Sequence, residues 1–220
     1  MAGKVYEFDR LTEEQKEEIR AELGRTKGNA LFVVHPYFAE AYVRAFPLLG
    51  QSEYDQYWSN LERLIRQHNC PVFVMLEHTP KMDQVAQRMV GKIPGMAIIV
   101  YTGDANPRPI LRGLKNKPPE AMSIAAAAEK FGKELGIRRA IISGEVRRPT
   151  SGNELGRHRG CVVELNSLLR APFLVGHKIT IRKGVRTTRP VQRTIQTEYR
   201  LRATFPFDER FIRARRRGTR

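Results

Sequence analysis

Four short runs of residues that are apolar at every position set the main constraint on how this chain folds. Longer segments with apolar residues at helical spacing separate them. Strands joined by such helices pair in parallel, and strands without polar positions are covered on both faces. With a fifth expected strand, the runs predict a three-layer α/β fold with a doubly wound, mostly parallel sheet of about five strands, flavodoxin-like or Rossmann-like. The expected strands cover residues 30–34, 71–76, 96–101, 140–142 and 177–181.

Helix start signals lie between these strands. Thr12 and Gln15 form a capping box at the start of a helix predicted over residues 11–24, which has few apolar residues and is expected on the surface. Further helices are predicted to begin near Pro36, Ser52, Thr79, Pro119 and Cys161.

The pattern divides the chain into three parts. Residues 1–27 hold the surface helix, residues 28–182 the α/β domain and residues 183–220 a basic arm, in which residues 194–207 alternate like a solvated strand before a tip predicted to be disordered. The predicted core consists of residues 31–34, 72–76, 97–100, 141–142 and 179–181.

The net charge of +16 is concentrated in the last third of the chain. Residues 1–150 contain 22 Lys and Arg against 18 Asp and Glu, whereas residues 151–220 contain 17 against 5. This asymmetry favours a polyanionic partner, RNA or DNA, or a small phosphorylated or carboxylate ligand. The alternative is that the arginines are solvated, form ion pairs or bind an acidic partner protein.

The composition, 41% hydrophobic and 28% charged, is typical of a soluble globular protein. No apolar run approaches the roughly 20 residues of a membrane helix, and the charged N-terminus does not resemble a signal peptide. Cys70 and Cys161 are expected to be free thiols in a reducing cytoplasm.

Polar residues follow the predicted strands, at the edge where parallel α/β sheets bind ligands. His35, Glu77 and Asp104 are candidate catalytic residues, because histidines and carboxylates at one edge can do acid–base work. They are equally the residue types that cap helices and form turns. The chain contains no HExxH or paired CxxC motif, so no metal site is predicted. The sequence does not identify a cofactor.

Known phosphate-binding and hydrolase motifs do not occur. The sequence lacks GxGxxG after the first strand, GxxxxGK[ST] and GxSxG. Their absence disfavours standard dinucleotide-binding, NTP-hydrolysing and α/β-hydrolase functions.

Cys161 is a candidate nucleophile. A helix N-terminus and nearby arginines, here Arg157 and Arg159, lower the pKa of a thiol. The alternative is a small buried residue that packs the first turn of the helix.

The layout resembles the isochorismatase-like hydrolases, which have a doubly wound sheet and a Cys-Val pair that opens a helix after a late strand. Cys161 and Val162 match that pair. The family has an Asp after the first strand, where this chain has His35, and a Lys after a central strand, where residues 102–104 read Thr-Gly-Asp. The resemblance therefore implies an analogous fold, and the family's catalysis is not transferred.

The loop over residues 143–160 is predicted to bind an anion. It follows a buried strand and ends at a helix N-terminus, where free backbone N–H groups attract negative charge. The alternative is a surface loop with solvated arginines. The predicted anion-binding residues are Arg147, Arg148, Arg157, Arg159 and Gly160.

The basic arm is predicted to bind RNA or DNA, because arginines suit phosphate contacts and the interleaved aromatic residues can stack on bases. Two classes of function therefore remain open. One is an anion- or nucleic-acid-binding protein, and the other is a small hydrolase or transferase that uses the cleft at the strand ends. The predicted nucleic-acid-binding residues are Arg200, Arg202, Arg213, Arg215, Arg216 and Arg217.

Overall fold

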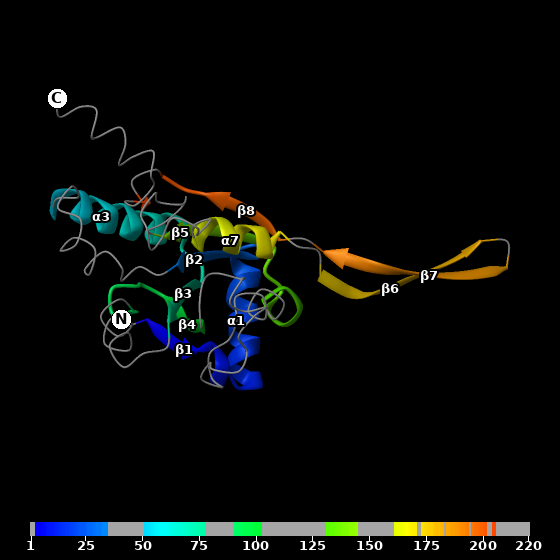
Figure 1. The fold of residues 1–220 in the computed structure, drawn as a ribbon. Helices are drawn as coiled ribbons and strands as arrows, with labels where there is room; N and C mark the ends of the chain where they lie inside the picture. The colour runs from blue at the N-terminus through cyan, green and yellow to red at the C-terminus, as the bar shows by residue number, and fades with distance from the viewer. Residues whose placement is uncertain are drawn as a thin grey trace, which may run out of the picture.

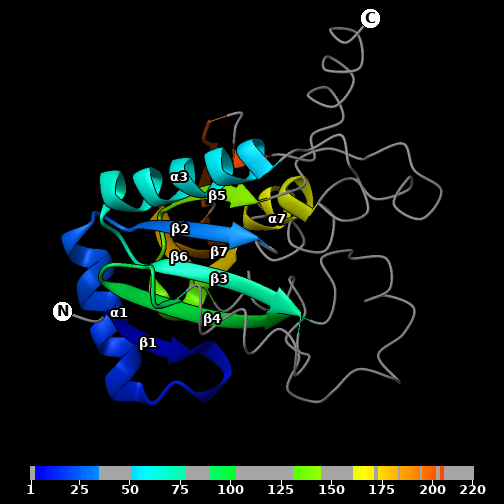
Figure 2. The ribbon, with the colours of Figure 1, turned by 90° about the vertical axis from the view of Figure 1, so that its left-hand side faces the viewer.

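A six-stranded parallel sheet, in the order β1-β4-β3-β2-β5-β8, forms the centre of the protein in this computed structural model (Figures 1 and 2). The structure describes residues 3–34, 51–77, 90–102, 131–144, 161–170, 173–182, 184–193, 195–201 and 204–205. The strands are β1 (Lys4–Glu7), β2 (Asn29–Val34), β3 (Val72–Glu77), β4 (Met96–Thr102), β5 (Arg139–Gly144) and β8 (Gln196–Tyr199).

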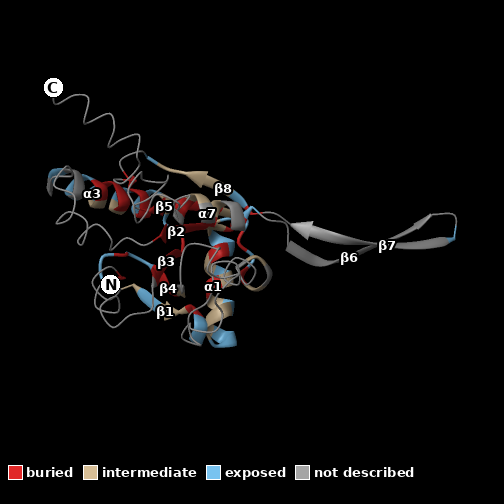
Figure 3. Cartoon of the chain, in the orientation of Figure 1, coloured by how far each residue is buried: buried red, intermediate tan, exposed pale blue. Residues whose placement is uncertain are grey.

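Helices cover both faces of this sheet, which confirms the predicted three-layer, doubly wound α/β class. On one face lie α1 (Glu13–Arg25), α7 (Cys161–Leu169), the 3-10 turn η1 (Phe8–Arg10) and the π-helical turn η3 (Phe131–Leu135); α3 (Gln51–His68) covers the other. Figure 3 shows the buried strands between these layers.

The strands are apolar at every position because alternate residues enter two different cores. In β2, Phe32 and Val34 pack with α1 and α7, whereas Leu31 and Val33 pack with α3. The rings of Phe32 and Phe73 stack across neighbouring strands with centroids 4.9 Å apart. Burial on both faces explains why these runs lack the polar alternation of a half-exposed strand.

The predicted capping box of α1 is confirmed. The Thr12 hydroxyl accepts a hydrogen bond from the Gln15 backbone N–H at 3.2 Å, and the Gln15 side chain accepts one from the Thr12 N–H at 2.9 Å. Although few residues of α1 are apolar, Ile19 and Leu23 are buried against the sheet. The helix is therefore part of the core on its inner side.

The prediction that residues 177–181 form the fifth strand of the parallel sheet is wrong. These residues belong to β6 (Phe173–Arg182), which pairs antiparallel with β7 (Val185–Arg193) in a separate two-stranded ribbon. The predicted core segment 179–181 is therefore not part of the parallel sheet. A parallel connection needs a dozen or more residues, whereas only two residues join β6 to β7. Gly184, with φ of 76°, allows that tight turn.

The parallel sheet instead includes β1 from the N-terminal part of the chain and β8 from the C-terminal part. β1 pairs with β4, and β8 pairs with β5, both in parallel. β1 was not predicted, because its sequence KVYE has two charged residues among four and Val5 is exposed. β8 lies within the expected solvated strand 194–207, but it is a strand of the main sheet. The division of the chain at residues 27 and 182 remains a prediction.

Other predicted helices fall partly outside the described residues. The helices expected near Pro36, Thr79 and Pro119 all begin outside them. Of the helix expected from Pro119, residues 131–135 are described and form η3. Among the described residues, none of the helices is both long and apolar enough to cross a membrane.

Candidate functional site

The direction of the chain reverses between β2 and β5, which defines the main candidate site. From β2 the chain adds β3 and then β4 on one side, and afterwards adds β5 on the other side of β2. Val34 and Gly144 pair at the carboxyl ends of β2 and β5. In open α/β sheets, ligands bind outside the carboxyl ends of the strands at such a switch point.

The first turn of α7 packs directly on this edge. A Cβ atom added to Gly144 would lie 2.7 Å from Cγ2 of Val162 and 2.8 Å from the Val34 carbonyl oxygen. Only glycine allows the helix and strand to approach so closely. The backbone of Cys161, the first residue of α7, therefore lies beside the switch point, as predicted for a helix that begins there.

Ser143 and Arg200 supply unsatisfied donors near the same edge. Ser143 is fully buried, and among the described residues neither its Oγ nor the buried Nε of Arg200 has a hydrogen-bond partner. Tyr199 pairs with Ile142, and Ser143 and Arg200 are the residues that follow this pair in the two chain segments. Each of these buried donors suits an acceptor oxygen, such as that of a bound water.

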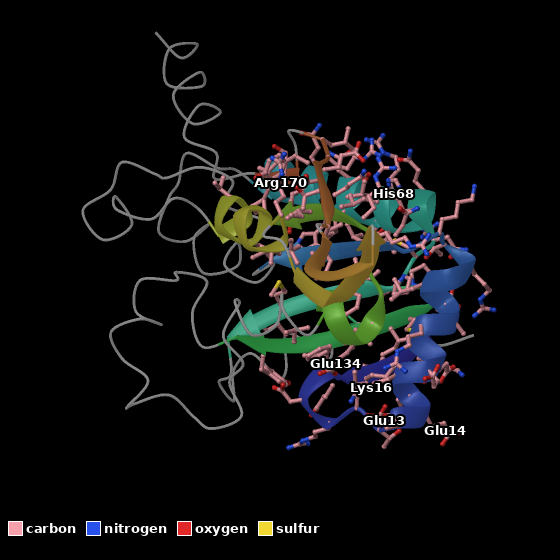
Figure 4. All side chains as sticks on the ribbon, turned by 90° about the vertical axis from the view of Figure 1, so that its right-hand side faces the viewer. Glu13, Glu14, Lys16, His68, Glu134 and Arg170 are labelled. Carbon is pink, nitrogen blue, oxygen red and sulfur yellow. The ribbon has the colours of Figure 1, made fainter. Side chains whose placement is uncertain are left out.

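An ion-pair network extends from Arg200 across β8 and β5. Arg200 Nη1 lies 2.7 Å from Glu198 Oε1, and Glu198 also accepts a hydrogen bond from Arg139. His68 lies at the end of α3 (Figure 4), and the charges of Arg200, Glu198 and Arg139 act on it. Burial, then the positive charge of Arg200, lower the pKa of His68 below its usual range. His68 is therefore expected to be neutral at pH 7.

The four predicted catalytic residues are only partly described. Glu77 ends β3 and Cys161 begins α7, so their backbones lie at the carboxyl edge of the sheet. His35 and Asp104 lie outside the described residues. Whether these four side chains converge on one pocket remains a prediction.

All five predicted anion-binding residues, and five of the six predicted nucleic-acid-binding residues, lie outside the described residues. The loop that contains them starts after Gly144 and ends at Cys161, so both of its ends lie at the switch point. Arg200 is described, and Glu198 neutralises part of its charge. The residues outside the description are Arg147, Arg148, Arg157, Arg159, Gly160, Arg202, Arg213, Arg215, Arg216 and Arg217.

Cys70 lies at the opposite edge of the sheet, just before β3. Its thiol is buried, and burial raises its pKa to about 11. It is therefore protonated at neutral pH and is a structural residue rather than a nucleophile.

The sequence analysis did not identify the basic β6–β7 ribbon as a unit. Residues 173–193 contain six Lys and Arg and no Asp or Glu. The ribbon follows α7 and precedes β8, and it projects from the body on the side of α1 and α7 (Figure 1). The dipeptide Lys183-Gly184 between two strand-forming runs was the signal that could have revealed it.

The described side chains contain no group of three or more His, Cys, Asp or Glu residues that could hold a metal ion. No protein-family model, curated protein or solved structure matches the chain.

Proposed function

We propose that this protein binds nucleic acid through its basic C-terminal third. The observation that supports this most directly is the β6–β7 ribbon, which extends from the body and contains six Lys and Arg and no Asp or Glu. A projecting element that contains basic and no acidic residues attracts the phosphate backbone of a nucleic acid, and this attraction weakens as the salt concentration rises.

The loop over residues 143–160 belongs to the same proposal as a second anion-binding element. It begins and ends at the switch point, whereas the ribbon joins the end of α7 to the start of β8. The backbone N–H of Gln196, the first residue of β8, donates to the carbonyl of Arg138 at the amino end of β5. The ribbon and the loop therefore leave the sheet from opposite edges. A cytoplasmic location with reduced thiols is part of the proposal.

The proposal is tested by measuring the binding of labelled duplex DNA, single-stranded DNA and duplex RNA between about 50 and 200 mM salt. We expect the affinity for at least one of them to fall by about a thousandfold over this range if six or more phosphates are contacted. A chain that ends at residue 205 lacks the arginine-rich residues 206–220 and measures their contribution to binding. Failure of the full chain to bind any of these nucleic acids, or binding that is independent of salt, would contradict the proposal.

A small hydrolase or transferase is the second candidate function. The position of Cys161 at the start of α7, beside the switch point, favours it. A thiol in that position is expected to react with electrophiles well below pH 8. The rate of alkylation of a Cys70→Ser variant as a function of pH measures the pKa of Cys161 directly. A pKa of about 8.5 or higher would remove the case for a nucleophile.

A further inference from the structure

The register of the β6–β7 ribbon sorts its residues onto two different faces. Lys178 is opposite Arg189, Thr180 is opposite Thr187, and Arg182 is opposite Val185. Residues that face each other across an antiparallel pair lie on the same side, and every second residue along a strand does so too. One face is called here the basic face; besides Gly176, Val185 and Val191, it contains Lys178, Thr180, Arg182, Thr187 and Arg189.

The opposite face has a different composition. It contains the pairs His177 with Pro190, Ile179 with Thr188, and Ile181 with Arg186. Its single permanent cation is Arg186. The irregular register between Leu174 and Gly176 is a bulge near the base of the ribbon, and a bulge re-aims the strands beyond it. The ribbon thus presents a defined basic side along most of its length.

The dimensions of the ribbon match one kind of nucleic acid. Strands of 10 and 9 residues extend about 30 Å. A two-stranded ribbon fits the major groove of B-form DNA, which is about 12 Å wide. The deep, narrow major groove of A-form RNA excludes side chains. Single strands are held by stacking on aromatic residues, and Phe173 at the base is the only Phe, Tyr or Trp in residues 173–193.

We propose that the β6–β7 ribbon enters the major groove of duplex DNA with its basic face toward the bases and phosphates. This inference rests on the proposed nucleic-acid binding and specifies its partner. Arg182 and Arg189 donate hydrogen bonds to guanine edges or to phosphates, and Lys178 contacts phosphate. The hydroxyl groups of Thr180 and Thr187 lie between these cations and donate hydrogen bonds to the DNA. The ribbon projects away from the main sheet in Figure 1, to which its described strands are not hydrogen-bonded.

The first test removes the charge of the basic face. A variant with Lys178→Gln, Arg182→Gln and Arg189→Gln is compared with one in which three exposed cations of the body are changed, Lys27→Gln, Arg25→Gln and Arg66→Gln. Both lose three positive charges. We expect the ribbon variant alone to bind duplex DNA about 100-fold more weakly at constant salt and to lower the salt slope by about 3. Equal losses in both variants would overturn the inference, because net charge alone would then account for binding.

A second comparison separates the two faces of the ribbon. Arg182→Gln and Arg186→Gln remove the same side chain from opposite faces at neighbouring positions, because Arg182 is opposite Val185 and Arg186 is opposite Ile181. The first is expected to weaken binding at least about fivefold more than the second. Thermal unfolding of each variant shows whether the body is intact, which it should be, because the ribbon is separate from the main sheet.

Dimethyl sulfate footprinting locates the groove, because it methylates guanine N7 in the major groove and adenine N3 in the minor groove. Protection of guanine N7 that disappears in the ribbon variant supports the inference. Protection of adenine N3 alone, or tighter binding of duplex RNA or single-stranded DNA than of duplex DNA, overturns it while the proposed function stands. Failure of the full chain to bind any nucleic acid contradicts both proposals.

Discussion

Val162 in the first turn of α7 lies directly over Gly144 at the end of β5, with no room for a Cβ atom between them. This contact fixes the helix start at the switch point between β2 and β5. The third atom that such a Cβ would meet, Cβ of Val34, lies 3.2 Å away. Strand and helix therefore position each other at the candidate site through one glycine.

Gly144→Ala is expected to destabilise the protein by about 1–3 kcal/mol, because the added methyl group would lie 2.8 Å from the Val34 backbone oxygen, closer than van der Waals contact. Urea unfolding measures the change. Gly24→Ala is the matched control, since Gly24 lies inside α1 with open space at its Cβ position. That substitution should stabilise the protein by roughly 0.5–1 kcal/mol. Equal effects of the two substitutions would argue against the contact.

Tyr6 is expected to titrate at about pH 12. Its hydroxyl donates to Glu18, and this hydrogen bond, followed by burial, raises the pKa of Tyr6 to about 12. Because the pKa of the folded state lies above the unfolded value near 10, the stabilisation is complete below pH 10 and is lost as pH rises through 12. Phenolate absorbance, compared between wild type and Tyr6→Phe, isolates this group. Glu18→Gln should lower the midpoint, and an unchanged midpoint would refute the assignment.

Cys70 should resist thiol reagents in the folded protein. Burial raises its pKa to about 11, so the reactive thiolate is scarce at pH 8. In a Cys161→Ser variant, where Cys70 is the remaining thiol, we expect slow labelling that accelerates sharply when denaturant unfolds the chain. Fast labelling under native conditions would mean that the residue is accessible.

Phe205 should be essential for stability although it lies near the C-terminus. It is buried, packs edge-to-face on Tyr199 with ring centroids 6.2 Å apart, and belongs to the core beneath α1 and α7. Phe205→Ala is expected to lower the free energy of unfolding by about 3–5 kcal/mol.

A chain that ends at residue 182 should fail to fold, because it lacks β8, Ile195 and Phe205, whereas a chain that ends at residue 205 should fold. Thermal unfolding of both truncations decides the point; a cooperative transition in the shorter chain would show that β8 is dispensable.

The alternation of apolar runs and helical spacing determined the fold class. β2, β3, β4 and β5 all lie where the sequence predicted strands, because a strand covered on both faces is apolar at nearly every position. The start of α7 at Cys161 and the capping box at Thr12 were also predicted, since caps depend on residues close together in the sequence. The concentration of positive charge in the last third was evident from composition alone.

Only the tertiary structure decided which strands share a sheet. β1 and β8 are short edge strands whose pairing depends on β4 and β5, residues far away in the chain, and neither has the composition of a buried strand. β6 has apolar residues, but its partner is β7, to which a two-residue turn joins it. Local sequence specifies whether a segment is extended, while its partner depends on what the rest of the chain leaves unpaired. For the same reason the sequence located the basic charge but not the projecting ribbon that presents part of it.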